Sequence, residues 1–342
     1  MGGDGGEIGA GGGAVDELAR RGSSVVTAPR TTGFRHDALL YDGVDDLVAR
    51  LAPFVAAGVA QREAVLVVLD PPKIDRLRAA LGPDAEGVRF EDMGAVGSNP
   101  SRLIPVWRDF VEETGGARPD VRRRGVGEPV GPTRDHDELD ECLHHEALLN
   151  VEFGDDPDLW LACPYDRSAL DPHVLDLARR THPRMTGAGG DETSPLFVAD
   201  DAGALVAPLS PAPVDIEHPF GSGSFRDLRS YVTAEAEAAG LAPAVVQDLV
   251  LAVSEVATNS VLHGGGRGIL RVWLTDDALV CEITDRGSID HALVGRRRPS
   301  VGQPDGRGLW IVNQVCDFVQ LRSGPDGTVV RLHMKRPLPA AS

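Results

Sequence analysis

The sequence contains no long apolar run, few cysteines and only two lysines. No stretch approaches the roughly 20 apolar residues that a bilayer-spanning helix needs, and the N-terminal MGGDGGEIGAGGGAVDELARR lacks the apolar core of a signal peptide. We therefore expect a cytoplasmic protein with no membrane-spanning segment. The four cysteines show no CxxC spacing, so neither zinc nor a disulfide framework is indicated.

Two further absences concern phosphate binding. No G-x-x-x-x-G-K-[ST] follows a strand-like run in the first half, so a P-loop is excluded there. Of the charged residues, 21 basic and 37 acidic precede position 210, whereas 13 basic and 15 acidic follow it, within a net charge of -18. Because an acidic surface repels a phosphate backbone, we expect no direct binding to nucleic acid. A basic protein partner and a merely soluble surface both fit this balance.

The length of 342 residues predicts about two domains. Residues 1–30 are rich in glycine and polar residues, and we expect them to be disordered. In residues 31–185, strand-like runs such as DALLY, AVLVVLD and LWLACPYD alternate with helix-like runs such as VDDLVARLAPFVAAGV. This alternation predicts a parallel sheet with helices on both faces. Residues 186–214 read as a proline-rich linker with one short hairpin from LFVAD to ALVAP, and residues 215–342 form the second domain.

The segment EVATNSVLHGG in the second domain carries the first of three motifs. Glu255 and Asn259 are four residues apart, so they share one face of a helix that ends near His263 and Gly264. That face places a base beside a metal ligand. Apolar and small residues repeat on another face, which we expect to be buried: Leu249, Val253, Val256 and Ser260.

The other two motifs, DRG and GRGLWIV, follow in the order that a nucleotide pocket needs. Asp285 ends the strand-like run LVCEIT, and Gly287 would let a planar ring approach the backbone. Gly306 and Gly308 precede the helical run LWIVNQVCDFV, where free amide groups suit phosphate oxygens. A β-hairpin precedes DRG and a last strand, GTVVRLHMKR, follows, so we expect helices on one face of a mixed sheet, a two-layer α/β sandwich.

This ordered set resembles the N, G1 and G2 boxes of the GHKL, or Bergerat-fold (HATPase_c), ATPases over residues 215–337. The resemblance implies ATP and Mg²⁺ as cofactors, with Asn259 as the Mg²⁺ ligand, Asp285 at the adenine amino group and Glu255 as the candidate general base. The other nucleotide contacts it implies are His263, Gly287, Gly306, Arg307, Gly308, Leu309 and Thr328. His263 also fits a helix-capping role. The alternative to this pocket is a solvated helix face with ordinary glycine turns.

Arg296, Arg297 and Arg298 lie where this superfamily has its nucleotide lid. One of them, or Arg307, would steady the γ-phosphate, or else the run is a solvated basic loop. The second box reads DRGS with no further glycine, which leaves the lid geometry open.

Within this superfamily the chain is most similar to the anti-sigma-factor serine kinases. The linker offers no dimerising helix hairpin of a histidine kinase, and no transducer domain follows the last strand. The resemblance implies a serine/threonine kinase that sequesters a sigma factor and phosphorylates an anti-anti-sigma (STAS-type) antagonist, a partner switch in transcription regulation. A non-catalytic ATP-binding anti-sigma module, and a histidine kinase with His144 or His145 as acceptor, stay open. Either form is compatible with a homodimer.

Several phrases of the first domain, among them GFRHDALLYDGVDDLV, HHEALLNVEF and ACPYDRSALD, resemble the MEDS family of sensory domains. The resemblance implies a RecA-like or KaiC-like α/β unit that has lost its phosphate loop and senses a small-molecule ligand. The candidate ligand or metal residues are His36, Glu128, His145, Glu146 and Cys163. Because most such groups are satisfied by hydrogen bonds within a fold, a structural role stays open for each.

Overall fold

Runs rich in leucine and β-branched residues build a seven-stranded sheet in the first half of the chain, in the order β3-β2-β4-β5-β1-β6-β7. All neighbouring strands are parallel except the edge pair β6 and β7. The computed structural model describes residues 1, 33–117, 121–154, 158–187, 189–198, 207–300 and 306–337. The strands are β1 (Arg35–Tyr41), β2 (Ala64–Leu69), β3 (Arg89–Asp92), β4 (Arg123–Gly127), β5 (Leu159–Asp166), β6 (Arg184–Gly187) and β7 (Gly190–Thr193).

Helices cover both faces of this sheet, as the alternating pattern predicts. One face packs its apolar side chains with those of α1 (Gly43–Ala60) and α2 (Pro71–Leu81). The other packs with α4 (Leu103–Ala117), α5 (His136–Phe153) and α6 (Pro172–Thr181). Short elements complete this half: α3 (Met93–Val96) and the 3-10 turns η1 (Gly82–Gly87) and η2 (Pro100–Arg102).

The first sheet continues to Thr193, eight residues beyond position 185, where the sequence alternation ends. Strands β6 and β7 are four residues each and join through a glycine turn, so their composition resembles a linker. The expected disorder of residues 1–30 and the hairpin expected over residues 196–208 fall wholly or largely outside the described residues.

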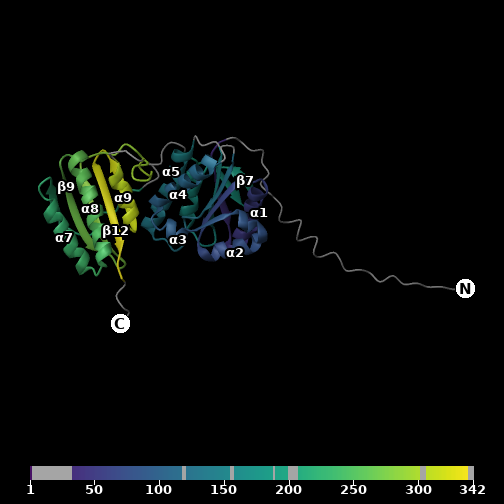
Figure 1. The fold of residues 1–342 in the computed structure, drawn as a ribbon, viewed down its shortest axis with the longest axis horizontal. Coiled ribbons are helices and arrows are strands. Elements are labelled where there is room, and N and C mark those ends of the chain that lie inside the picture. The colour runs from purple at the N-terminus through teal and green to yellow at the C-terminus, as the bar shows by residue number, and fades with distance from the viewer. Residues whose placement is uncertain are drawn as a thin grey trace. The chain divides into compact units, whose positions relative to one another are not determined.

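A five-stranded sheet in the order β11-β12-β10-β9-β8 forms the second half. Its strands are β8 (His218–Gly221), β9 (Arg267–Leu274), β10 (Ala278–Asp285), β11 (Phe318–Gly324) and β12 (Gly327–Lys335), and every described pair is antiparallel. The expectation of a mixed sheet is therefore wrong for these residues, where the hairpins β9–β10 and β11–β12 account for two of the four antiparallel pairs. Helices α7 (Phe225–Ala238), α8 (Pro243–His263) and α9 (Arg307–Val315) pack on one face (Figure 1).

The helical run LWIVNQVCDFV is shorter than expected. Helix α9 ends at Val315, because Cys316 takes an extended conformation (φ -85°, ψ 142°), and strand β11 begins two residues later at Phe318. The apolar alternation of FVQLR, which the helical pattern obscures, is the strand signal.

Helix α8 is the one described helix long and apolar enough to cross a membrane. Its apolar face lies in the core of the second half, where Leu249 and Val253 are fully buried and Val256 is 2% exposed. The buried face is the one that the three-and-four spacing of these residues predicts.

Candidate functional site

The pocket begins on α8, whose half-buried face carries Glu255 and Asn259 one turn apart. Helix α9 packs against this face with Gly308. A Cβ added to Gly308 would lie 2.9 Å from Glu255 Oε2 and 3.4 Å from Asn259 Nδ2. A side chain at position 308 would therefore displace the Glu255 carboxylate from its present position.

Asp285, the last residue of β10, is held by two hydrogen bonds. Its Oδ2 accepts from Ser260 Oγ of α8 at 2.6 Å, and its Oδ1 accepts from the Gly287 amide at 2.8 Å. Gly264 at the end of α8 completes this packing, since a Cβ there would lie 2.4 Å from Asp285 Cγ. A Cβ on Gly287 would lie 2.7 Å from the His263 carbonyl oxygen. The carboxylate is thus oriented by its neighbours and keeps further lone pairs for a donor.

Strand β12 supports the turn after Asp285. Thr328 pairs with Asp285 in the β10–β12 register, and its hydroxyl donates to the Gly287 carbonyl oxygen at 2.8 Å. Gly327 adopts a left-handed φ of 125°, and a Cβ there would lie 2.2 Å from the Asp285 carbonyl oxygen. Thr328 is 5% exposed, so its role in this arrangement is to fix the turn that carries Gly287.

The third motif forms the beginning of α9. Gly306 caps the helix in the left-handed region (φ 83°). The amides of the first helical turn, including that of Gly308, have no acceptor within the helix, so they could bind an anion. Arg307 is exposed beside them, whereas Leu309 is 8% exposed and packs in the core. His263 is the exposed last residue of α8, and its carbonyl oxygen lies next to Gly287.

These residues fit a magnesium nucleotide. Asn259 offers an amide oxygen, a ligand type that Mg²⁺ accepts, and α9 offers amide groups at the positive end of its dipole. The glycines at positions 264, 287 and 308 keep the backbone close to Asp285 and Glu255, where any Cβ would collide. The arrangement combines an oriented carboxylate that could accept from a purine amino group, a second carboxylate that could act as a base, and a helix start that could bind phosphate.

The lid arginines bind carboxylates of the first half and leave neither of the expected roles to Arg296. Arg296 is 5% exposed and donates to Glu141 Oε2 on α5 at 3.0 Å. Arg297 donates to Glu152 at 2.6 Å, and Arg298 to Asp109 at 2.8 Å. Neither a γ-phosphate contact nor a solvated loop predicts these ion pairs. The acidic partners lie more than 140 residues earlier in the sequence, so local sequence does not indicate them.

Two backbone carbonyls around the end of α9 are also bound from the first half. Arg102 donates through Nε to the Asn313 carbonyl oxygen at 2.7 Å and through Nη2 to the Cys316 carbonyl oxygen at 2.6 Å. Asn99 donates to the same Asn313 oxygen at 3.2 Å. Helix α9 is therefore held at its C-terminal end by the first half of the chain.

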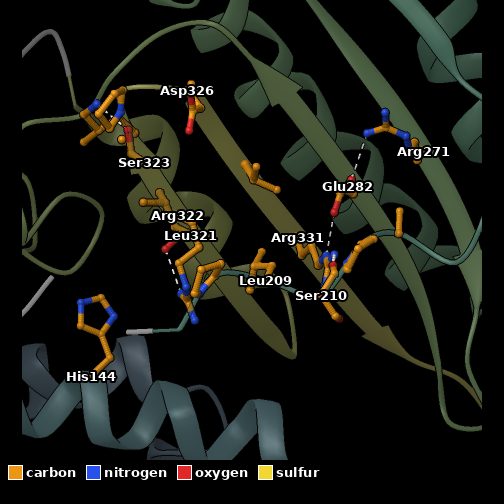
Figure 2. Close-up of a pocket in the computed structure, with 18 of the residues that line it drawn as sticks. His144, Leu209, Ser210, Arg271, Glu282, Leu321, Arg322, Ser323, Asp326 and Arg331 are labelled. Carbon is orange, nitrogen blue, oxygen red and sulfur yellow. Dashed lines mark hydrogen bonds and ion pairs between the residues drawn. The ribbon is translucent and has the colours of Figure 1, made fainter. Parts of the chain in front are cut away.

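A cavity of about 890 Å³ lies on the opposite face of the second sheet from the helices. Glu282 stands at its wall between Arg271 at 3.1 Å and Arg331 at 2.7 Å (Figure 2). Arg331 also donates to the Ser210 carbonyl oxygen. Because Arg271 also donates to Glu217, the two arginines and two glutamates balance in charge, and this set presents no unpaired group for chemistry.

The first-half candidates separate into two buried sets. His36, Glu146 and Cys163 come together, with His36 Nε2 3.0 Å from Glu146 Oε2 and 3.3 Å from Cys163 Sγ. His182, which sequence reasoning missed, completes this group. Its only sequence signal was a polar residue directly after α6, and nothing in its spacing connects it to the other three.

Glu128 lies in the other set, where it accepts from Tyr41 at 2.5 Å and from Lys73 Nζ at 2.6 Å. Burial raises the pKa of Glu128, and Lys73 opposes that rise. His145 belongs to neither set: burial lowers its pKa to about 3, so it is neutral at physiological pH.

Ser260 is a second residue whose role the sequence did not reveal. Its spacing indicated only a core residue, whereas its hydroxyl donates to Asp285.

Two family models match this chain. The MEDS (MEthanogen/methylotroph, DcmR Sensory) domain matches residues 35–183, and the histidine kinase-like ATPase domain matches residues 222–334. Both resemblances are therefore confirmed. A crystal structure of the RsbU and RsbW domains of a Mycobacterium tuberculosis protein aligns over 39% of this chain and 36% of that one, with 18% identity and a TM-score of 0.26. A comparison with curated proteins found no match.

Proposed function

We propose that the chain, which joins a MEDS domain to a histidine kinase-like ATPase domain, is an ATP-dependent anti-sigma factor and serine/threonine kinase. The observation that carries the proposal is the packing of Glu255 and Asn259 against Gly308, next to the oriented carboxylate of Asp285. Glu255 and Asn259 are half-buried, unlike the side chains of a solvated helix face. The proposed domains are residues 31–185 for the sensory part, 186–214 for the linker and 215–342 for the ATPase, with strands β6 and β7 extending the sensory sheet into the linker as far as Thr193.

Each pocket residue has a role in this proposal. Asn259 would ligate the Mg²⁺ of bound ATP, and Asp285 would accept from the adenine amino group. Gly306, Arg307 and the α9 amides would bind the phosphates. Glu255 would take the proton of the incoming serine or threonine hydroxyl, a general-base role that needs a carboxylate facing the transferred group. When bound, Mg-ATP would supply the phosphoryl group that is transferred. Arg307 and the α9 amides would balance the negative charge of its phosphates.

The burial of the first-half histidines disfavours the histidine-kinase alternative. His145 is 1% exposed and His144 is held by an ion-pair contact with Glu141 at 3.7 Å. A phosphoacceptor must reach the γ-phosphate, and neither imidazole is placed to leave its surroundings without breaking buried contacts. A hydroxyl on a separate protein is the acceptor that fits this chain better.

The ion pairs of the lid arginines favour regulation by the sensory domain. Glu141 on α5 accepts from Arg296 of the lid and from Arg322 of β11. A ligand that moves α5 would therefore change the position of the lid and the access of nucleotide. In this proposal the ATP-bound form sequesters a sigma factor in the cytoplasm, and phosphorylation of a STAS-type antagonist weakens the competing partner.

The test measures nucleotide binding and phosphoryl transfer separately. Calorimetry on the full chain should show Mg-ATP binding that Asn259→Ala weakens and Glu255→Gln spares. With γ-labelled ATP and the STAS-domain proteins of the same genome, label should appear on a serine or threonine, and Glu255→Gln should abolish it. Absence of ATP binding overturns the proposal. Binding without transfer favours the non-catalytic anti-sigma module, and acid-labile label on the chain itself favours a histidine kinase.

A further inference from the structure

Four side chains that are far apart in the sequence meet between the first sheet and helices α5 and α6. His36 lies on β1, Glu146 on α5, Cys163 on β5, and His182 directly after α6. Their nearest nitrogen, oxygen and sulfur atoms all lie within 4.8 Å of one another, and all four residues are buried. None of them belongs to the proposed nucleotide pocket.

The hydrogen bonds around the two histidines determine which ring nitrogens face the cluster. The Asn150 amide nitrogen donates to the Thr181 carbonyl oxygen at 2.8 Å, so its Oδ1 is directed at His36 Nδ1, 3.1 Å away. His182 Nδ1 lies 3.0 Å from the Ala178 carbonyl oxygen and 2.9 Å from Thr181 Oγ1, whose hydroxyl can itself donate to the Leu177 or Ala178 carbonyl oxygen. The Asn150 and Ala178 oxygens can only accept, which assigns the proton of each ring to Nδ1 and a lone pair to each Nε2.

Those two lone pairs are directed at one carboxylate oxygen. Glu146 Oε2 lies 3.0 Å from His36 Nε2 and 3.3 Å from His182 Nε2, and the side chains of all three residues are fully buried. His182 Nε2 and Glu146 Oε1 have no hydrogen-bond partner among the described residues. Buried acceptors that face one another repel unless a proton or a metal ion lies between them.

We propose that His36, Glu146, Cys163 and His182 bind one divalent transition-metal ion, with Zn²⁺ as the ion that the donors suit best. Two imidazoles, one carboxylate and one thiolate are all zinc ligands, and the two anionic groups would neutralise the ion, as full burial requires. Tetrahedral ligands about 2.0 to 2.3 Å from zinc stand roughly 3.3 to 3.8 Å apart. The separations of 3.0 and 3.3 Å are at or just below this range and no separation within the cluster exceeds 4.8 Å, so closing around an ion needs shifts of about 1 Å or less.

The surroundings resemble those of a metal site in a second respect. Metal-bound histidines usually donate their remaining ring N–H to a carbonyl or carboxylate oxygen, which fixes the ring. Asn150 and the Ala178 carbonyl fill this role here. Since four protein ligands leave no open position, the ion would join β1, β5, α5 and the end of α6, and would not catalyse a reaction.

The test uses the full chain, purified without an affinity tag that binds metals, stripped with a chelator and reloaded. Titration with Co²⁺ as a spectroscopic substitute should give one ion per chain with a thiolate-to-cobalt charge-transfer absorption. Equimolar Zn²⁺ should remove that absorption and raise the temperature of unfolding. Cys163→Ser should eliminate the charge-transfer band, and His182→Gln should weaken binding at least 10-fold.

Matched controls come from the same domain. Cys142 is a fully buried thiol on α5 outside the cluster, and His136 is an exposed histidine at the start of α5. Cys142→Ser and His136→Gln should bind Co²⁺ as the wild type does. If wild-type protein takes up neither Co²⁺ nor Zn²⁺, the cluster holds a proton and the proposal is wrong. Equal binding by wild type and both ligand variants would also overturn it. The wild-type measurement decides the question even if a variant fails to fold.

Discussion

Replacing Gly308 with alanine tests the placement of Glu255 without removing any functional group. The added Cβ would lie 2.9 Å from Glu255 Oε2, where ordinary contacts begin at 3.4 Å, so the carboxylate must retreat by about 0.5 Å. Because the atom displaced is the end of a flexible side chain, the free energy of unfolding should change by no more than about 1 kcal/mol. Misplacing a reacting group by about 1 Å costs roughly 100-fold, so phosphoryl transfer should fall roughly 10- to 100-fold.

The assay is the initial rate of label transfer to the STAS-type antagonist at saturating ATP, with urea unfolding in parallel. Gly223→Ala is the matched control, because its Cβ would meet nothing within 4 Å and its φ is not left-handed. Glu255→Gln is the second mutation of a double-mutant cycle with Gly308→Ala. If Gly308→Ala acts through Glu255, it should cost little more in the Glu255→Gln background. The same loss in both backgrounds, or no loss in either, would refute the reasoning.

Three further predictions follow from the contacts. Ser260→Ala removes the 2.6 Å hydrogen bond to Asp285 and should lower ATP affinity about 10-fold by calorimetry; unchanged affinity would mean that the hydroxyl does not orient the carboxylate. Arg296→Ala leaves the buried Glu141 short of a partner and should cost about 3 kcal/mol in urea unfolding, whereas Arg298→Ala, at an exposed ion pair, should cost less than about 1 kcal/mol; equal losses would contradict this difference. Burial alone would raise the pKa of Glu141, but the neighbouring histidine and arginines outweigh burial and lower it from 4.5 to about 2. This carboxylate therefore stabilises the fold above about pH 4.5 and loses that contribution as pH falls toward 2. Wild type should lose more stability than Glu141→Gln between pH 7 and pH 3, and parallel losses would argue against the assignment.

Local patterns predicted most of the fold. The run LWLACPYD coincides with β5, Leu159–Asp166, because a buried parallel strand is apolar on both faces. Pro243 begins α8 and Gly264 follows it, as the preferences of helix ends require. The sequence pattern failed where a helix and a strand have the same apolar composition. The apolar run that starts in α9 continues past Cys316 into β11, so the end of the helix could not be predicted.

The site was predictable only as far as its residues lie close in sequence. Glu255 and Asn259 are one helical turn apart, so their common face could be inferred. The hydrogen bond from Ser260 to Asp285 joins residues of different elements, and the spacing of Ser260 reported only its burial. The ion pairs of the lid arginines depend on which tertiary partners the chain brings together, and the sequence pattern carries no information about that.

Helix α5 connects the proposed metal cluster to the nucleotide lid, because it carries both Glu146 and Glu141, the partner of Arg296. An ion that fixes Glu146 should therefore restrict α5 and with it the lid. Coupling between two sites is commonly 1 to 3 kcal/mol, so ATP affinity should differ roughly 5- to 150-fold between metal-free chain and chain with one equivalent of Zn²⁺. Calorimetry in excess Mg²⁺ measures this difference, and Cys163→Ser should show none. Equal ATP affinity in both wild-type forms would show that α5 does not couple the sites, and a difference that persists in Arg296→Ala would place the coupling in another contact.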